Sequence, residues 1–245
     1  MSDHLIIDNI LIAFETMHYL NQKTCDKVSE MALKLDMSKA FDRVEWRCLE
    51  GIMLKMGFDT KWVNLMMQCI TFVTYSVKIN GQPWGRITLS CGLRQGDLIS
   101  SFLFLFCVEG LSTLLHQFAS NGLLRYVLAC PFGPRIFHLF FADDSIIFCQ
   151  ATPEQCSHLE HLLTIYEQAS SQQLNKDKTT LFFSRNTPCD TQEDIKNRFG
   201  AEVIWQHETY LGLPSLVGRS KKNTFKALKE KLDNKLFEWK EKLLS

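Results

Sequence analysis

The sequence predicts an α+β fold in which a mainly antiparallel sheet is backed by helices. Two hairpins support this prediction, because strand-like apolar runs flank both Asn80-Gly81 and the Ala-Asp-Asp-Ser turn at 142–145. Between the strand-like runs, apolar residues recur at helical spacing. The chain has 245 residues, 46% of them hydrophobic, so it can bury a full core as one large domain or two small ones.

Each element is predicted from its own local pattern. Asp59 is expected to cap a helix, Pro153 begins another, and Asn80-Gly81 is the strongest turn signal in the chain. Apolar spacing predicts helices over 1–20, 44–57, 59–69, from about residue 100, and over 153–170, 190–199 and 221–243. Strands are predicted over 31–36, 75–79, 86–89, both arms of 138–149, 180–183 and, with a turn, 210–214.

The charge is zero in total but unevenly spread. Residues 219–245 carry nine Lys/Arg and four Asp/Glu, and the rest of the chain carries 18 and 23. A basic end beside an acidic body suits a protein that binds a polyanion at one end and metal at the other. A solvated basic helix face explains the same residues equally well.

Cysteine usage and hydropathy exclude several protein classes. The nine cysteines form no Cys-x-x-Cys pair and no zinc-like group, which indicates reduced thiols in an intracellular protein, nuclear or cytoplasmic. Acidic residues interrupt the N-terminal apolar run, so no signal peptide is expected. Residues 98–115 are apolar but short for a membrane span and include Glu109, so we expect a buried core helix and no membrane.

Carboxylates at strand ends are the main chemical signal. Asp143 and Asp144 form a pair between two apolar strands, where repulsion would raise one pKa unless cations neutralise them. Asp36 ends another strand, so the three carboxylates could converge at one sheet edge and hold two divalent ions. A plain surface turn for the pair, and a helix-capping role for Asp36, remain alternatives.

Five segments, in the order of the family, resemble the motifs of reverse transcriptases. Their residues are most similar to those of plant LINE-type non-LTR retrotransposons. Motif A is resembled by Leu33-Lys34-Leu35-Asp36-Met37-Ser38-Lys39-Ala40-Phe41-Asp42 and motif B by Gly92-Leu93-Arg94-Gln95-Gly96-Asp97. Motif C is resembled by Phe141-Ala142-Asp143-Asp144, motif D by Leu174-Asn175-Lys176-Asp177-Lys178, and motif E by Tyr210-Leu211-Gly212. The resemblance implies a polymerase palm and the start of a helical thumb.

The resemblance also implies a role for each metal-site residue. Asp36, Asp143 and Asp144, with the carbonyl of Met37, would hold two Mg²⁺ ions, which Mn²⁺ could replace. Lys178 would be the general acid for pyrophosphate, with an ordinary surface lysine as the alternative.

Further residues would bind substrate. Phe41 would lie under the nucleotide sugar and exclude a 2′-OH, or be only a core aromatic. Lys39 and Ala40 would lie near the nucleotide, with a solvated Lys39 as the alternative. Gln95 and Gly96 would line the nucleotide and template. Arg94 would contact phosphate, or would be only an exposed side chain on the loop. The primer grip would be Tyr210, Leu211 and Gly212, and the basic helix after Arg219 would contact duplex phosphates.

The sequence departs from the family pattern at several positions. Leu98 stands where proline is usual, Ser101 where a second proline or a polar aromatic is common, and Ser171 where a glycine is expected. The fingers segment with its basic residues, the endonuclease and most of the thumb are expected to be missing. The predicted division is a fingers remnant with the helix leading into the palm (1–30), the palm (31–205), and primer grip with early thumb (206–245).

The predicted function is RNA-directed DNA polymerisation, a nucleotidyl transfer from dNTP to a primer 3′-OH on an RNA template. Such a fragment is expected to be feeble or inactive, and no stable protein partner is predicted. One alternative is a non-catalytic nucleic-acid-binding remnant. A second is an RNA-templated RNA polymerase, against which Phe41 argues because a ribonucleotide needs room at the 2′ position.

Overall fold

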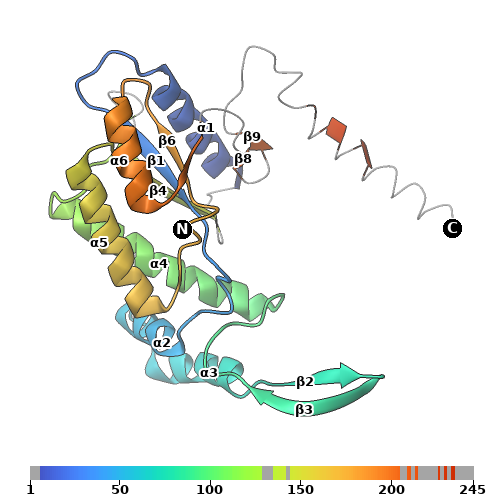
Figure 1. The fold of residues 1–245 in the computed structure, drawn as a ribbon. Coiled ribbons are helices and arrows are strands. Elements are labelled where there is room, and N and C mark those ends of the chain that lie inside the picture. The colour runs from blue at the N-terminus through green and yellow to red at the C-terminus, as the bar shows by residue number, and fades with distance from the viewer. Residues whose placement is uncertain are drawn as a thin grey trace.

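A five-stranded sheet forms the centre of the molecule (Figure 1). The computed structural model describes residues 6–128, 135–141 and 144–204, with short pieces at 209–210, 213–214, 226, 229–230 and 233–234. The strands run in the order β4 (His138–Phe141), β5 (Asp144–Gln150), β1 (Glu30–Leu35), β6 (Thr180–Phe183) and β7 (Glu202–Val203). All neighbours are antiparallel except β6 and β7, which confirms the predicted α+β class.

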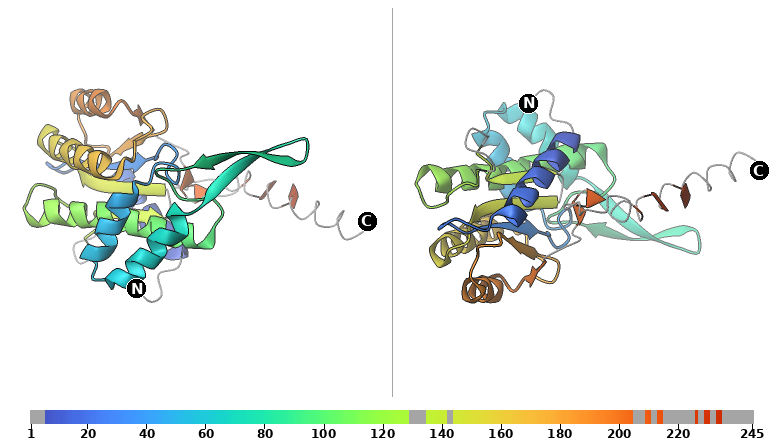
Figure 2. Two further views of the ribbon diagram at one scale, coloured as in Figure 1. Left: turned by 90° about the horizontal axis from the view of Figure 1, so that it is seen from below. Right: turned by 90° about the horizontal axis from the view of Figure 1, so that it is seen from above.

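Helices cover both faces of this sheet. Side chains alternate along β1, so Met31, Leu33 and Leu35 face one cluster and Ala32 faces the other. The first cluster contains residues of α4 (Leu98–Ser120), α5 (Pro153–Ser170) and α6 (Cys189–Phe199). The second contains residues of α1 (Ile6–Gln22), which crosses the opposite face (Figure 2). Burial on both faces explains why four of the six residues of β1 are apolar.

A third cluster lies beyond the sheet, where α2 (Trp46–Lys55), α3 (Thr60–Thr71) and the first half of α4 meet. Asp59 caps α3 as predicted, since its side chain accepts a hydrogen bond from the Lys61 N–H at 2.8 Å. Helix α4 belongs to this cluster at one end and to the sheet cluster at the other. It therefore joins the sheet to the helical part.

A two-stranded hairpin, β2 (Thr74–Ile79) and β3 (Gln82–Thr88), extends away from the body (Figures 1 and 2). Its turn has positive φ at Asn80 (49°) and Gly81 (84°), as the Asn-Gly pair predicts. Every residue of β3 is exposed. Among the described elements, its extensive contacts are those between its own two strands.

Most predicted helices and strands are present with small shifts of their ends. The strand predicted over 86–89 begins four residues earlier, at Gln82, and the helix predicted from 44 begins at Trp46. Where a short strand with a turn was predicted over 210–214, the structure has two short paired strands, β8 (Thr209–Tyr210) and β9 (Leu213–Pro214). Most of the helix predicted over 221–243 lies outside the described residues.

The expectation that α4 is buried was wrong for one side of its first half. Leu98, Phe102 and Leu105 are 81%, 67% and 51% exposed, because no described element packs on that side. The opposite side, with Leu103, Phe104 and Cys107, is buried in the third cluster. With 23 residues, α4 is the one helix in the described chain long and apolar enough to cross a membrane by length and composition.

Candidate functional site

Two of the predicted metal carboxylates lie at one end of the sheet. Leu35, the last residue of β1, pairs with Ser145 of β5, and Asp36 and Asp144 are the next residue on each strand. Because the strands are antiparallel, the end of β1 lies beside the start of β5. Asp144 also pairs with Phe141 of β4. Asp143 lies outside the described residues.

The other side of Asp36 contacts the predicted motif D. Its carbonyl accepts a hydrogen bond from the Asn175 N–H at 2.8 Å, and its carboxylate Oδ2 accepts one from Asn175 Nδ2 at 3.1 Å. Ser38 donates its N–H to the Gln173 carbonyl at 2.8 Å, so Met37 faces Leu174 in an isolated bridge. The bonds to residues 173 and 175 are made by Asp36 and Ser38. The carbonyl of Met37, between them, therefore points away from Leu174 and toward the side of β5.

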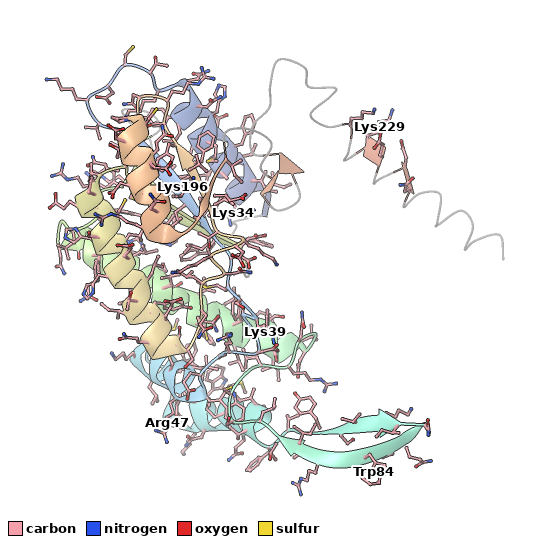
Figure 3. All side chains as sticks on the ribbon, in the orientation of Figure 1. Lys34, Lys39, Arg47, Trp84, Lys196 and Lys229 are labelled. Atoms are coloured by element: carbon pink, nitrogen blue, oxygen red, sulfur yellow. The ribbon has the colours of Figure 1, made fainter. Side chains whose placement is uncertain are left out.

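The predicted nucleotide-binding turn follows directly. Lys39 is exposed with φ of 53° and lies where the chain leaves the sheet for the helices (Figure 3). Ala40 is buried, and its carbonyl accepts a hydrogen bond from Gln172 Nε2 at 2.9 Å. The half-buried ring of Phe41 stacks on Phe104 with centroids 4.6 Å apart. One side of this ring is thus core, and the rest is accessible.

The predicted motif B loop packs against the same turn. The N–H of Leu93 donates to the Phe41 carbonyl and that of Gly92 to the Val44 carbonyl, both at 2.8 Å. Gly92 has φ of +92°, and a Cβ there would lie 2.7 Å from the Asp42 carbonyl oxygen, so only glycine fits. The next three residues, Arg94, Gln95 and Gly96, are exposed.

Asp97 ends the motif B loop. Its carboxylate accepts a hydrogen bond from the Ile99 N–H at 3.1 Å and so caps α4. The residue that resembles the last position of motif B therefore has a structural role in the helix, which fixes where the exposed loop meets α4.

The two remaining predicted groups are placed differently. Lys178 is exposed, and its N–H donates to the Asn175 carbonyl at 3.2 Å, so it lies on a turn that starts beside Asp36. Of the primer grip, only the backbone of Tyr210 is described, in β8. Leu211 and Gly212 lie outside the described residues.

A contact with Ser112 joins the first residue of β4 to α4. His138 Nε2 lies 3.1 Å from the Ser112 hydroxyl, and the rings of His116 and Phe140 pack around it. Burial, assisted by the nearby His116, lowers the pKa of His138 from 6.5 to about 4. His138 is therefore neutral at pH 7 and serves the packing of β4.

A cavity of about 820 Å³ lies at the opposite end of β1 and β5, where Glu30 and Gln150 are found. Its lysine, Lys23, is already paired with Glu30 at 2.8 Å and Asp26 at 3.1 Å. This cavity is thus separated from Asp36 and Asp144 by the length of the strands.

The end of the sheet where Asp36 and Asp144 lie has the donor atoms that a divalent cation needs. Asp36 and Asp144 supply carboxylate oxygens and Met37 a backbone carbonyl, which are the ligands that Mg²⁺ prefers. Within the described residues, no group of three or more His, Cys, Asp or Glu side chains is close enough to hold a metal. The third predicted carboxylate, Asp143, is not among them.

Residues 2–228 match the family described as reverse transcriptase (RNA-dependent DNA polymerase). The chain belongs to this family. The protein is also similar to a transposon TX1 uncharacterized 149 kDa protein of Xenopus laevis, 27% identical over 71% of this chain and 13% of the relative. A Pol polyprotein from the R2 retrotransposable element of Popillia japonica is 27% identical over 53% of this chain and 20% of its own length.

Two further similarities complete the comparison. An uncharacterized mitochondrial protein of Arabidopsis thaliana is 48% identical over 27% of this chain and 55% of its own length. The structure of apo telomerase from Candida tropicalis matches with a TM-score of 0.50 and 16% identity, over 73% of this chain and 34% of the telomerase chain. The reverse transcriptase chain thus has the same fold as telomerase over most of its length, and it spans less than two thirds of each of these relatives.

The family membership agrees with the motifs found in the sequence. Reverse transcriptases generally use divalent metals. Two residues with close contacts to motif A, Gln172 and Asn175, were given no role from the sequence, because buried or half-buried amides follow no periodic pattern.

Proposed function

We propose that this chain is the palm of an RNA-directed DNA polymerase from a non-LTR retrotransposon. The observation that carries the proposal is the pairing of β1 with β5, which sets Asp36 beside Asp144 in a chain of the reverse transcriptase family. The substrates would be an RNA template, a DNA primer and dNTPs. The site of action would be intracellular, nuclear or cytoplasmic, where these substrates occur.

Each part of the site would have a distinct task. Asp36, Asp144 and Asp143, with the Met37 carbonyl, would hold two Mg²⁺ or Mn²⁺ ions, which would activate the primer hydroxyl and stabilise the leaving pyrophosphate. The accessible side of Phe41 would lie under the deoxyribose, and Lys39 and Ala40 would adjoin the nucleotide. The exposed Arg94, Gln95 and Gly96 would line the nucleotide and template.

The remaining proposed roles concern proton transfer and the primer. Lys178, on its exposed turn, would donate a proton to pyrophosphate as the new bond forms. Tyr210, Leu211 and Gly212 would hold the primer end. The proposed division remains 1–30, 31–205 and 206–245, with the last part adding a basic helix for duplex phosphates.

Primer extension on a primed RNA template tests the proposal. With Mg²⁺ or Mn²⁺ and dNTPs, the chain should extend the primer weakly, and Asp36→Asn and Asp144→Asn should each reduce extension to background. The control is Asp190→Asn, an exposed carboxylate at the start of α6 and outside the five motifs, which should retain wild-type extension.

Three outcomes would contradict the proposal or favour one of the alternative functions. Wild-type extension by Asp36→Asn would remove this residue from the chemistry. Extension with ribonucleotides as efficient as with deoxyribonucleotides would favour the RNA polymerase alternative. Nucleic-acid binding without any extension in either metal would favour a non-catalytic remnant.

A further inference from the structure

Asn175 makes two hydrogen bonds to one residue, Asp36. Its backbone N–H reaches the Asp36 carbonyl at 2.8 Å, and its side-chain amide reaches the carboxylate Oδ2 at 3.1 Å. Asn175 therefore contacts both the backbone and the side chain of Asp36. The backbone bond already joins the two segments, so the side-chain bond acts on the carboxylate itself.

Asn175 is held firmly at its own position. Its carbonyl accepts hydrogen bonds from the N–H of Lys178 at 3.2 Å, the N–H of Thr179 at 2.9 Å and the Thr179 hydroxyl at 2.8 Å. Thr179 is buried, and the strand after it pairs with β1. The backbone of Asn175 is therefore fixed, and its half-buried side chain extends from this fixed backbone to Asp36.

Fixing one oxygen of a carboxylate determines where the other oxygen points. An aspartate on a strand end rotates freely about χ2 in water, and a metal that binds it must first immobilise it. A donor on Oδ2 removes that cost in advance and leaves Oδ1 for a metal. Partners of this kind, behind the ligands of a metal, typically change affinity or activity by about 10–100-fold.

We propose that Asn175 is a positioning residue that orients the Asp36 carboxylate for a divalent cation. The proposal rests on the proposed function, since it assumes that Asp36 binds metal. The same residue begins the turn that carries Lys178, so it joins the metal carboxylate to the group proposed as general acid.

Binding of Mn²⁺ alone to the full 245-residue chain provides the test, with free Mn²⁺ measured by electron paramagnetic resonance. Asn175→Ala should raise the dissociation constant of Mn²⁺ by about 10-fold. The matched control is Gln173→Ala, two residues away with an exposed side chain and with its carbonyl bond to Ser38 unchanged. This control should change the dissociation constant by less than about 2-fold.

Asp36→Asn separates the inference from the proposed function. This variant should weaken Mn²⁺ binding strongly, and adding Asn175→Ala to it should have no further effect, because the amide acts only through the carboxylate. Equal binding by wild type and Asp36→Asn would refute the metal site itself. Weakened binding by Asp36→Asn with unchanged binding by Asn175→Ala would refute only the role of Asn175.

A second variant covers the case in which Asn175→Ala does not fold. Asn175→Leu keeps the branched shape of asparagine and the backbone bonds but cannot donate, so it should show the same 10-fold weakening. Circular dichroism and the melting temperature check the fold of each variant. Loss of the fold in both variants would overturn the proposal, because the contact would then serve folding and not the metal.

Discussion

The turn after β1 and the β2–β3 hairpin both lie outside the five-stranded sheet, yet they are supported very differently. Residues 36–45 are hydrogen-bonded from both sides, by 170–175 and by Gly92 and Leu93. The hairpin bonds to itself, and Trp84 on it is 70% exposed (Figure 3). Three or more strands are usually needed for independent stability, so the hairpin contributes little to the fold.

This difference shows that a strong secondary-structure signal does not predict burial. The hairpin has the clearest turn motif and alternating apolar residues, yet Val77 and Ile79 are 53% and 52% exposed. The turn after β1 has only a weak pattern but is held by backbone and amide contacts from distant segments. The support of this turn is therefore recognised from what surrounds it and not from its own residues.

The largest expected effect contrasts the core with the hairpin. Phe148 in β5 is 1% exposed, so Phe148→Ala should lower the free energy of unfolding by about 3–5 kcal/mol. Trp84→Ala should change it by less than about 0.5 kcal/mol, because the ring is exposed. Denaturant unfolding of both variants measures the difference. A large loss for Trp84→Ala would show that the hairpin is covered in solution.

The next effect tests the contact between motif B and the turn after β1. Gly92 and Gly96 both have positive φ, which costs alanine about 1–2 kcal/mol. Only at Gly92 would a Cβ meet backbone, 2.7 Å from the Asp42 carbonyl oxygen, whereas no atom lies within 4 Å at Gly96. Gly92→Ala should therefore cost about 1–3 kcal/mol more than Gly96→Ala in thermal unfolding. Equal losses would mean that the loop moves aside freely.

The smallest effect is a gain in stability at Ser171. This residue ends α5 in the left-handed conformation with φ of 57°, where the family pattern has glycine. Ser171→Gly should raise the free energy of unfolding by about 0.5–1 kcal/mol, since glycine is not strained there. The same substitution at the exposed helical Ser101 should lower it by about 0.5 kcal/mol. A loss at both positions would contradict the strain at Ser171.

Local chemistry explains which elements could be predicted from the sequence. Asp59 caps α3, Pro153 begins α5, and Asn80-Gly81 turns the hairpin, because each of these preferences acts within a few residues. The apolar run of β1 likewise predicted a strand, and its central place in the sheet became known only from the structure. The exposure of Leu98 and Phe102 could not be predicted in this way, since burial depends on what packs against a helix and not on its composition.

The candidate site was predictable only in part for the same reason. The position of Asp36 at a strand end follows from the sequence, and its place beside Asp144 follows from the pairing of β1 with β5. The bonds from Asn175 and Gln172 join segments far apart in the chain, and asparagine and glutamine are common in polar connectors. Asn175 lies in the segment that resembles motif D, but no local pattern indicates which of its side chains contacts Asp36, and Gln172 lies outside all five motifs.

The central place of β1 also determines when the protein can fold. This strand is complete at Leu35, but its two partners begin only at Asp144 and Thr180. Long loops must therefore close before either edge of β1 is paired, which slows folding. During synthesis, β1 stays unpaired until β5 has left the ribosome, and one edge remains open until Phe183 follows. In that interval, an apolar strand is exposed to aggregation, so a chain shortened before β6 should accumulate as insoluble protein.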